Sequence, residues 1–189
     1  MEIEQILEEC RNDLLNFFCN SPPMIWKEED LQSYLYHLLL IRDKDLRFRV
    51  HREYPIIFSW MPRNWAGYLD IAIVNDTKNG FRLQDARITH AIELKFLRDW
   101  KTGRSPRSLK KFENECERDC SKLLSKGINF NPDSRKYFWA FRYVEESQIS
   151  DVRKIMESIN WKDIEWIYVE SYTDGSPYKT LLSSNGSAL

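Results

Sequence analysis

The chain has 189 residues, of which 42% are apolar and 14% are aromatic. This composition suffices for one substantial hydrophobic core and excludes a disordered chain. The net charge of -1 and the pI of about 6.3 exclude a protein that binds nucleic acid through its overall charge, so such binding needs a local basic patch.

Two helices are predicted at the start of the chain. In residues 2–19 apolar side chains recur at helical spacing, at Ile3, Ile6, Leu7, Cys10, Leu14 and Phe17. The second helix runs from about Lys27 to Ile41, with an apolar stripe of Leu31, Leu35, Leu38 and Leu39. Glu28 lies at the N-terminal end of this stripe. Its position alone favours a charge that stabilises the helix dipole, and the alternative is a carboxylate directed toward the sheet.

Three strands are predicted next, over residues 47–58, 67–74 and 90–96. The first shows period-two alternation, and the other two are mostly apolar. A turn cluster at 75–80 ends the second strand, and residues 81–87 are ambiguous. Because the three strands follow one another along the chain, we expect them to form a meander.

A basic segment follows the third strand and runs into a helix. Against one acid, Asp99, its cationic side chains are Arg98, Lys101, Arg104, Arg107, Lys110 and Lys111. Such a segment could attract a phosphate backbone. The later elements are predicted as a helix over 108–126, a strand over 136–144, a helix over 151–159 with Ser150 as its cap, and a strand over 164–171.

The predicted order is α-α-β-β-β-α-β-α-β, which indicates an α/β protein with three layers, α/β/α, around a central mixed sheet. No linker or repeat divides the chain, so we expect a single domain over residues 1–182 and a disordered tail over residues 183–189.

The N-terminus lacks the basic and apolar blocks of a signal peptide, and the longest apolar run, 38–41, is too short to span a bilayer. The four cysteines form no C-x-x-C pair, which favours buried free thiols over a zinc or iron–sulfur site. We therefore expect a cytoplasmic protein with no membrane association.

The strand over 90–96 carries an acid and a base two residues apart, Glu93 and Lys95. Since side chains alternate along a strand, these two share a face and Ile92, Leu94 and Phe96 take the other. Charged groups in an apolar strand are costly unless they are paired or functional. The preceding strand carries one carboxylate, Asp70, among apolar residues.

These residue types suit the hydrolysis of a phosphodiester. Asp70 and Glu93, on neighbouring strands, could converge on one Mg²⁺, with Mn²⁺ as a substitute, because magnesium keeps several waters and needs few protein ligands. Lys95 could hold the attacking water and offset charge at the transition state. The alternative is that Glu93 and Lys95 pair with each other, or with Asp70, on an exposed sheet face.

Asp70 together with Glu93-Leu94-Lys95, in the order α-β-β-β-α-β, resembles the PD-(D/E)xK nuclease superfamily, which has the restriction-endonuclease-like fold. The resemblance covers residues 25–144. Glu28-Glu29-Asp30-Leu31 looks like the leading helix, whose glutamate contributes to the metal site, and Asp119-Cys120-Ser121-Lys122-Leu123 resembles the following helix, where a polar residue faces the site. Leu69 stands where the motif has proline, and the gap from Asp70 to Glu93 is long.

The resemblance implies a Mg²⁺-dependent nuclease, with DNA favoured over RNA. Asp70, Glu93 and Glu28 would be metal ligands, and Lys95 would act on the water. The alternative is an inactive nuclease-like module that binds nucleic acid or a protein partner. No separate target-recognition domain is recognisable, so a homodimer and a partner protein that supplies specificity both remain open.

Overall fold

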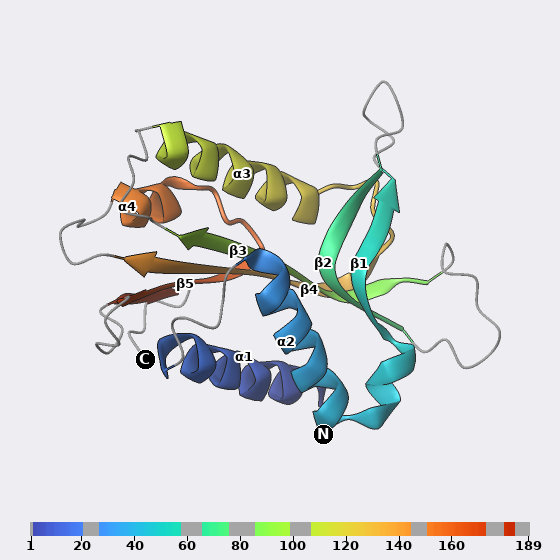
Figure 1. Ribbon diagram of the computed structural model, residues 1–189. Helices are drawn as coiled ribbons and strands as arrows, with labels where there is room; N and C mark the ends of the chain where they lie inside the picture. Colours follow the sequence, from blue (N-terminus) through green and yellow to red (C-terminus); the bar gives the residue numbers. More distant parts are fainter. Residues whose placement is uncertain are drawn as a thin grey trace.

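The computed structural model describes residues 2–20, 27–57, 66–75, 86–98, 107–144, 151–172 and 180–183. Helices lie on both sides of a mixed sheet (Figure 1). Helices α1 (Ile3–Asn20) and α2 (Glu28–Arg42) pack on one face, and α3 (Arg107–Leu123) and α4 (Asp151–Ser158) pack on the other. The chain is therefore an α/β protein, and its layers are consistent with the expected three-layer arrangement.

The described strands form one six-stranded sheet in the order β1-β2-β3-β4-β5-β6. They are β1 (Val50–Ile57), β2 (Ala66–Val74), β3 (Ile88–Arg98), β4 (Phe130–Val144), β5 (Glu165–Tyr172) and β6 (Thr180–Ser183). The meander of β1, β2 and β3 is antiparallel, as predicted. The pairs β3–β4 and β4–β5 are parallel, and β5–β6 is antiparallel.

Each face of the sheet carries its own hydrophobic cluster. Ile92 and Leu94 of β3 pack with α1 and α2, whereas Ala91 and Leu97 pack with α3 and α4. This alternation confirms the predicted facing of β3. It places Glu93 and Lys95 on the α3 side, on the same face as Ala91 and Leu97.

The end of α1 differs from the prediction by one residue. Phe18, not Phe17, is fully buried, and its ring stacks on Tyr143 with 4.5 Å between ring centroids. Phe17 is half-buried and stacks on Tyr34 of α2 at 4.2 Å. The last turn of α1 thus presents one aromatic ring to the sheet and the other to its neighbouring helix.

The first strand begins later than predicted. Residues Lys44–Phe48 form a short 3-10 helix, which starts where the Asp43 carboxylate accepts the Asp45 N–H at 2.9 Å. Phe48 is 47% exposed, and the Arg47 guanidinium lies 4.5 Å from its ring centroid. The apparent alternation at Phe48 was therefore misleading, because a side chain–backbone bond at Asp43 favours the turn.

Two other boundaries were also wrong. Strand β4 begins at Phe130 rather than Lys136, and the register shift between the pairs Ile88–Phe130 and His90–Arg135 shows that the residues between are bulged. Ser183 ends β6 instead of opening a disordered tail. Residues 184–189 and the predicted cap Ser150 lie outside the described residues.

All four cysteines are buried free thiols, as expected. Over the described ranges, no helix combines the length and the apolar character needed to cross a lipid bilayer.

Candidate functional site

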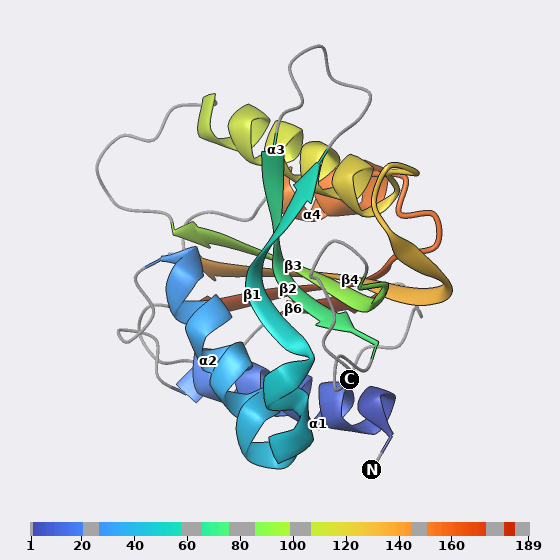
Figure 2. The ribbon, with the colours of Figure 1, turned by 90° about the vertical axis from the view of Figure 1, so that its right-hand side faces the viewer.

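Strands β2 and β3 separate at the place where the charged residues gather. The β2–β3 register runs from the Val74–Ile88 pair to the Ile71–Ile92 pair, and beyond it the two strands diverge. Figure 2 shows the paired strands β1 and β2 rising away from the rest of the sheet toward α3. Among the described residues, no strand pairs with the outer half of β3 on this edge, and we call this opening the fork.

Side-chain carboxylates take the backbone donors that the fork leaves free. The Leu94 N–H donates to Asp70 Oδ2 at 2.6 Å, and the Phe96 N–H donates to Glu28 Oε2 at 3.3 Å. Buried backbone N–H groups require an acceptor, so the divergence of the strands favours carboxylates at these two positions.

Strand β2 rotates about its own axis near Asp70, so that its side chains exchange faces of the sheet. Leu69 packs in the cluster on the α3 side, while Ile71 packs in the cluster on the α1 and α2 side. Residues two apart in a regular strand share a face, so the strand rotates between them. Glu53 of β1 lies between the pairs Arg52–Ile71 and Tyr54–Leu69 and has a φ of 51°, in the left-handed region that a non-glycine residue rarely adopts.

The variant Glu53→Gly tests whether this backbone strain is real. Glycine adopts a positive φ without steric cost, so we expect the free energy of unfolding to rise by up to about 1 kcal/mol, measured by urea unfolding. His51→Gly, at a regular position of the same strand, is the control and should be destabilising. A loss of stability in Glu53→Gly comparable to that of the control would contradict the assignment.

Helix α2 supplies two polar side chains to the fork, one turn apart. Gln32 donates from Nε2 to Asp70 Oδ1 at 2.8 Å, and Glu28 Oε2 lies 3.2 Å from Lys95 Nζ. Because residues four apart share a helix face, both reach the sheet alongside the buried leucines. Glu28 is therefore a carboxylate directed toward the sheet, the alternative that its position alone disfavoured.

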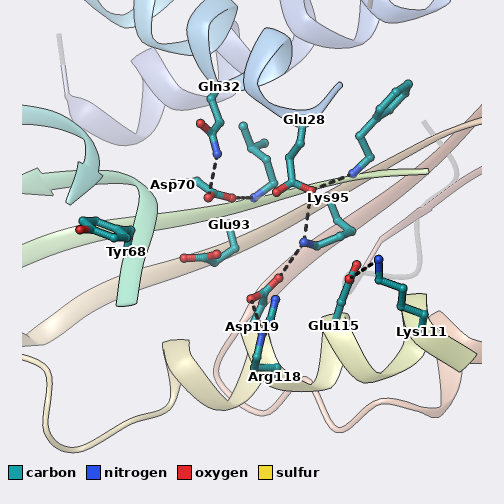
Figure 3. Close-up of polar contacts among 12 residues, drawn as sticks. Glu28, Gln32, Tyr68, Asp70, Glu93, Lys95, Lys111, Glu115, Arg118 and Asp119 are labelled. Carbon is teal, nitrogen blue, oxygen red and sulfur yellow. Dashed lines mark hydrogen bonds and ion pairs between the residues drawn. The ribbon is translucent and has the colours of Figure 1, made fainter. Parts of the chain in front are cut away.

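Helix α3 closes the network from the other side. Asp119 Oδ2 lies 3.0 Å from Lys95 Nζ, and Asp119 Oδ1 lies 3.4 Å from Lys122 Nζ. Lys122 Nζ lies 2.5 Å from Glu93 Oε2 and donates to the Tyr68 carbonyl at 2.9 Å. Figure 3 shows Glu28, Asp70, Glu93, Lys95 and Asp119 converging between the two helices.

Burial and mutual repulsion disfavour the charged form of the carboxyls. Burial, opposed by the Leu94 N–H, raises the pKa of Asp70 to about 7. Burial and the nearby Asp70 raise the pKa of Glu93 well above its ordinary value, and burial raises that of Glu28. For Lys95, burial alone would lower the pKa, but Asp119 and Glu28 outweigh it and the pKa is raised.

Comparison with family models, with curated proteins and with solved structures finds no match to this chain. Any function must therefore be argued from the site.

The carboxylates at the fork suit a divalent cation, but they do not by themselves form a complete coordination shell. Glu93 is 1% exposed, and its Oε1 has no hydrogen-bond partner among the described residues. A buried carboxylate oxygen without a partner is costly, and a cation would relieve that cost. In the described ranges, however, no three carboxylate, imidazole or thiolate groups are arranged to hold a metal by themselves. Magnesium bound through one or two carboxylates and several waters needs no such cage.

The structure brings together the four predicted site residues, Asp70, Glu93, Lys95 and Glu28. Glu93 and Lys95 are 1% and 7% exposed, so they are not a surface pair. Sequence reasoning did not assign Gln32, Asp119 or Lys122. Gln32 had a signal, since it is a polar residue on the apolar stripe of α2, and the resemblance indicated the segment of Asp119 and Lys122 without choosing between its residues.

The predicted basic segment is described only in part. Lys101 and Arg104 lie outside the described residues, as do the side chains of Arg98 and Arg107. Lys110 and Lys111 are exposed on α3 and pair with Glu113 at 2.7 Å and Glu115 at 3.6 Å. The assignment of this segment to nucleic-acid binding stays a prediction.

Proposed function

We propose that this protein is a Mg²⁺-dependent nuclease that hydrolyses phosphodiester bonds, with DNA as the favoured substrate and its active site at the fork. One observation carries the proposal. Four carboxyl groups converge at the fork on the ammoniums of Lys95 and Lys122, Arg118 lies 3.8 Å from Asp119, and one Glu93 oxygen has no described partner. When all four carboxyls are ionised, 4 − 3 = 1 negative charge is in excess. A divalent cation neutralises such an excess.

Asp70 and Glu93 are the proposed metal ligands, and Glu28 is an accessory acid. A bound Mg²⁺ or Mn²⁺ would activate a water and neutralise charge at the phosphorus. Without it, the raised pKa values of Asp70 and Glu93 mean that protons compete for the same oxygens. Metal affinity should therefore increase as the pH rises through about 7.

Lys95 is the proposed residue that positions the attacking water. Its Nζ is held between Glu28 and Asp119, from opposite helices, which fixes the side chain at the fork. The same contacts raise its pKa, so Lys95 remains an ammonium at neutral pH. It then acts by donating hydrogen bonds and offsetting negative charge, and not as a general base in this arrangement.

The order of the elements around the fork also supports the proposal. From α2 to β4 the described elements follow the order α-β-β-β-α-β, with Asp70 on the second strand and Glu93 and Lys95 on the third. On this basis we propose a restriction-endonuclease-like core. The location in the cytoplasm and the preference for DNA are part of the same proposal.

Cleavage assays with plasmid and oligonucleotide substrates, in DNA and RNA form, test the proposal directly. We expect cutting with Mg²⁺ or Mn²⁺, none in EDTA, and at least about a hundredfold loss in Glu93→Gln, which keeps the side-chain shape but not the charge. The matched control is Glu117→Gln, at an exposed position of α3, which should cut like the wild type.

Cutting that survives Glu93→Gln at the wild-type rate would place the activity elsewhere. A Mg²⁺-dependent rise in thermal stability without any cutting would instead favour the alternative, a nuclease-like module that binds nucleic acid or a protein partner.

A further inference from the structure

Lys122 of α3 is enclosed by oxygens much as a bound cation would be. Its Nζ lies 2.5 Å from Glu93 Oε2, 2.9 Å from the Tyr68 carbonyl oxygen and 3.4 Å from Asp119 Oδ1. These oxygens come from β3, β2 and α3, so the ammonium links three elements at the fork. The Lys122 side chain is only 13% exposed.

Carboxylate and carbonyl oxygens are also the ligands that hard divalent cations prefer. Glu93, the acid that we assign to the metal, has one oxygen on Lys122 and the other without a described partner. The ammonium therefore occupies one oxygen of the carboxylate that a cation would need, and it would repel a cation bound to the other oxygen.

We propose that Lys122 is the counter-ion of Glu93 in the metal-free protein and that it withdraws toward Asp119 when a divalent cation binds the same carboxylate. The inference rests on the proposed function, because it assigns a role at the same site. Asp119 makes the withdrawal feasible, since its Oδ1 already contacts Lys122 while its Oδ2 holds Lys95.

The exchange keeps the network close to neutral. When all four carboxyls are ionised they face Lys95, Lys122 and Arg118, so a divalent ion changes the net charge of the network from 3 − 4 = −1 to 3 + 2 − 4 = +1. The resident ammonium thus partly satisfies Glu93 in the metal-free protein and sets the concentration of cation needed to replace it.

Direct Mn²⁺ binding, measured at pH 8 by electron paramagnetic resonance of the free ion, tests the proposal without using activity. We expect Lys122→Met to bind Mn²⁺ with a Kd at least about tenfold below that of the wild type, because the competing charge is gone. Lys95→Met removes the same charge from the network without vacating Glu93, so it should tighten binding less.

A Lys122→Met protein that binds Mn²⁺ no more tightly than the wild type would overturn the proposal, as would equal tightening in Lys95→Met. Absence of Mn²⁺ binding in both folded wild type and Lys122→Met would overturn the proposed metal site itself. The two failures are therefore distinguishable.

Reductive methylation of the wild-type protein, followed by mass spectrometry, gives a second measurement that needs no variant. We expect Lys122 to be modified several-fold faster with saturating Mn²⁺ than in EDTA, while exposed Lys111 changes little and serves as the internal control. An unchanged rate at Lys122 with Mn²⁺ bound would show that the ammonium does not move and would overturn the proposal.

Discussion

Lys95→Met is expected to lower the free energy of unfolding by about 3 kcal/mol at pH 8, because it removes one partner of a buried ion network. The Lys95 side chain is 8% exposed, and its Nζ lies within 3.2 Å of both Glu28 and Asp119. Without the ammonium, these two carboxylates face each other across the fork. Urea unfolding followed by circular dichroism measures the change.

The loss should become smaller as the pH is lowered toward 5, because burial raises the pKa of Glu28 and a Glu28 carboxyl that takes up a proton no longer repels Asp119. Lys95 itself stays charged throughout this range, since its pKa is raised. Lys111→Met is the matched control on α3. Its side chain is 77% exposed and pairs with Glu115 at 3.6 Å, so the stability should hardly change.

The partner of Lys95 can be identified with a double variant. Glu28→Gln in the Lys95→Met background should recover part of the lost stability, because it removes one of the two uncompensated carboxylates. Equal losses in Lys95→Met and Lys111→Met would mean that the network contributes nothing, and the contacts at the fork would then need another explanation.

Asp70→Asn is expected to be more stable than the wild type at alkaline pH when no divalent cation is present. The pKa of Asp70 is raised from an ordinary value of 3.8 to about 7. Between these values the folded protein holds a proton that the unfolded chain has released, so wild-type stability falls as the pH rises. Asparagine does not titrate, and the difference between variant and wild type should widen by about 2–4 kcal/mol from pH 4 to pH 8.

The amide introduced by Asp70→Asn can be accommodated because only one end of the Gln32 side-chain amide has a hydrogen-bond partner among the described residues. Gln32 donates to Asp70, and its own Oε1 has no hydrogen-bond partner among the described residues. Rotation of the Gln32 amide would let that oxygen accept from the new side chain. Urea unfolding in EDTA at pH 4 and pH 8 measures the two stabilities. The control variant is Asp133→Asn, because Asp133 is exposed. A pH-independent difference would show that Asp70 ionises normally.

The larger part of the fold could be predicted from the sequence. Helices α1 and α2 and the meander of β1, β2 and β3 follow from helical and period-two spacing of apolar residues. The errors lie where local chemistry overrides spacing. A side-chain bond at Asp43 converts the expected start of β1 into a 3-10 helix, and β6 has only four residues, too few to show a period.

The sequence predicts which site residues share a face of one strand, but it does not predict which residues of other elements they contact at the fork. Spacing placed Glu93 and Lys95 on one face, and the structure agrees. The same spacing left open that the two pair with each other, yet Glu93 contacts Lys122 and Lys95 contacts Asp119, both on α3. Such partners depend on how a distant helix crosses the sheet, which no local pattern encodes.

The fork also bears on edge-to-edge pairing of the sheet with another chain. In the part of the chain that the structure describes, the outer half of β3 is an open strand edge, and such edges are templates for pairing with another chain. The carboxylates of Asp70 and Glu28 occupy its Leu94 and Phe96 donors, so a foreign strand would have to displace charged, hydrogen-bonded groups. The same side chains that we assign to metal chemistry thereby protect a sheet edge against aggregation.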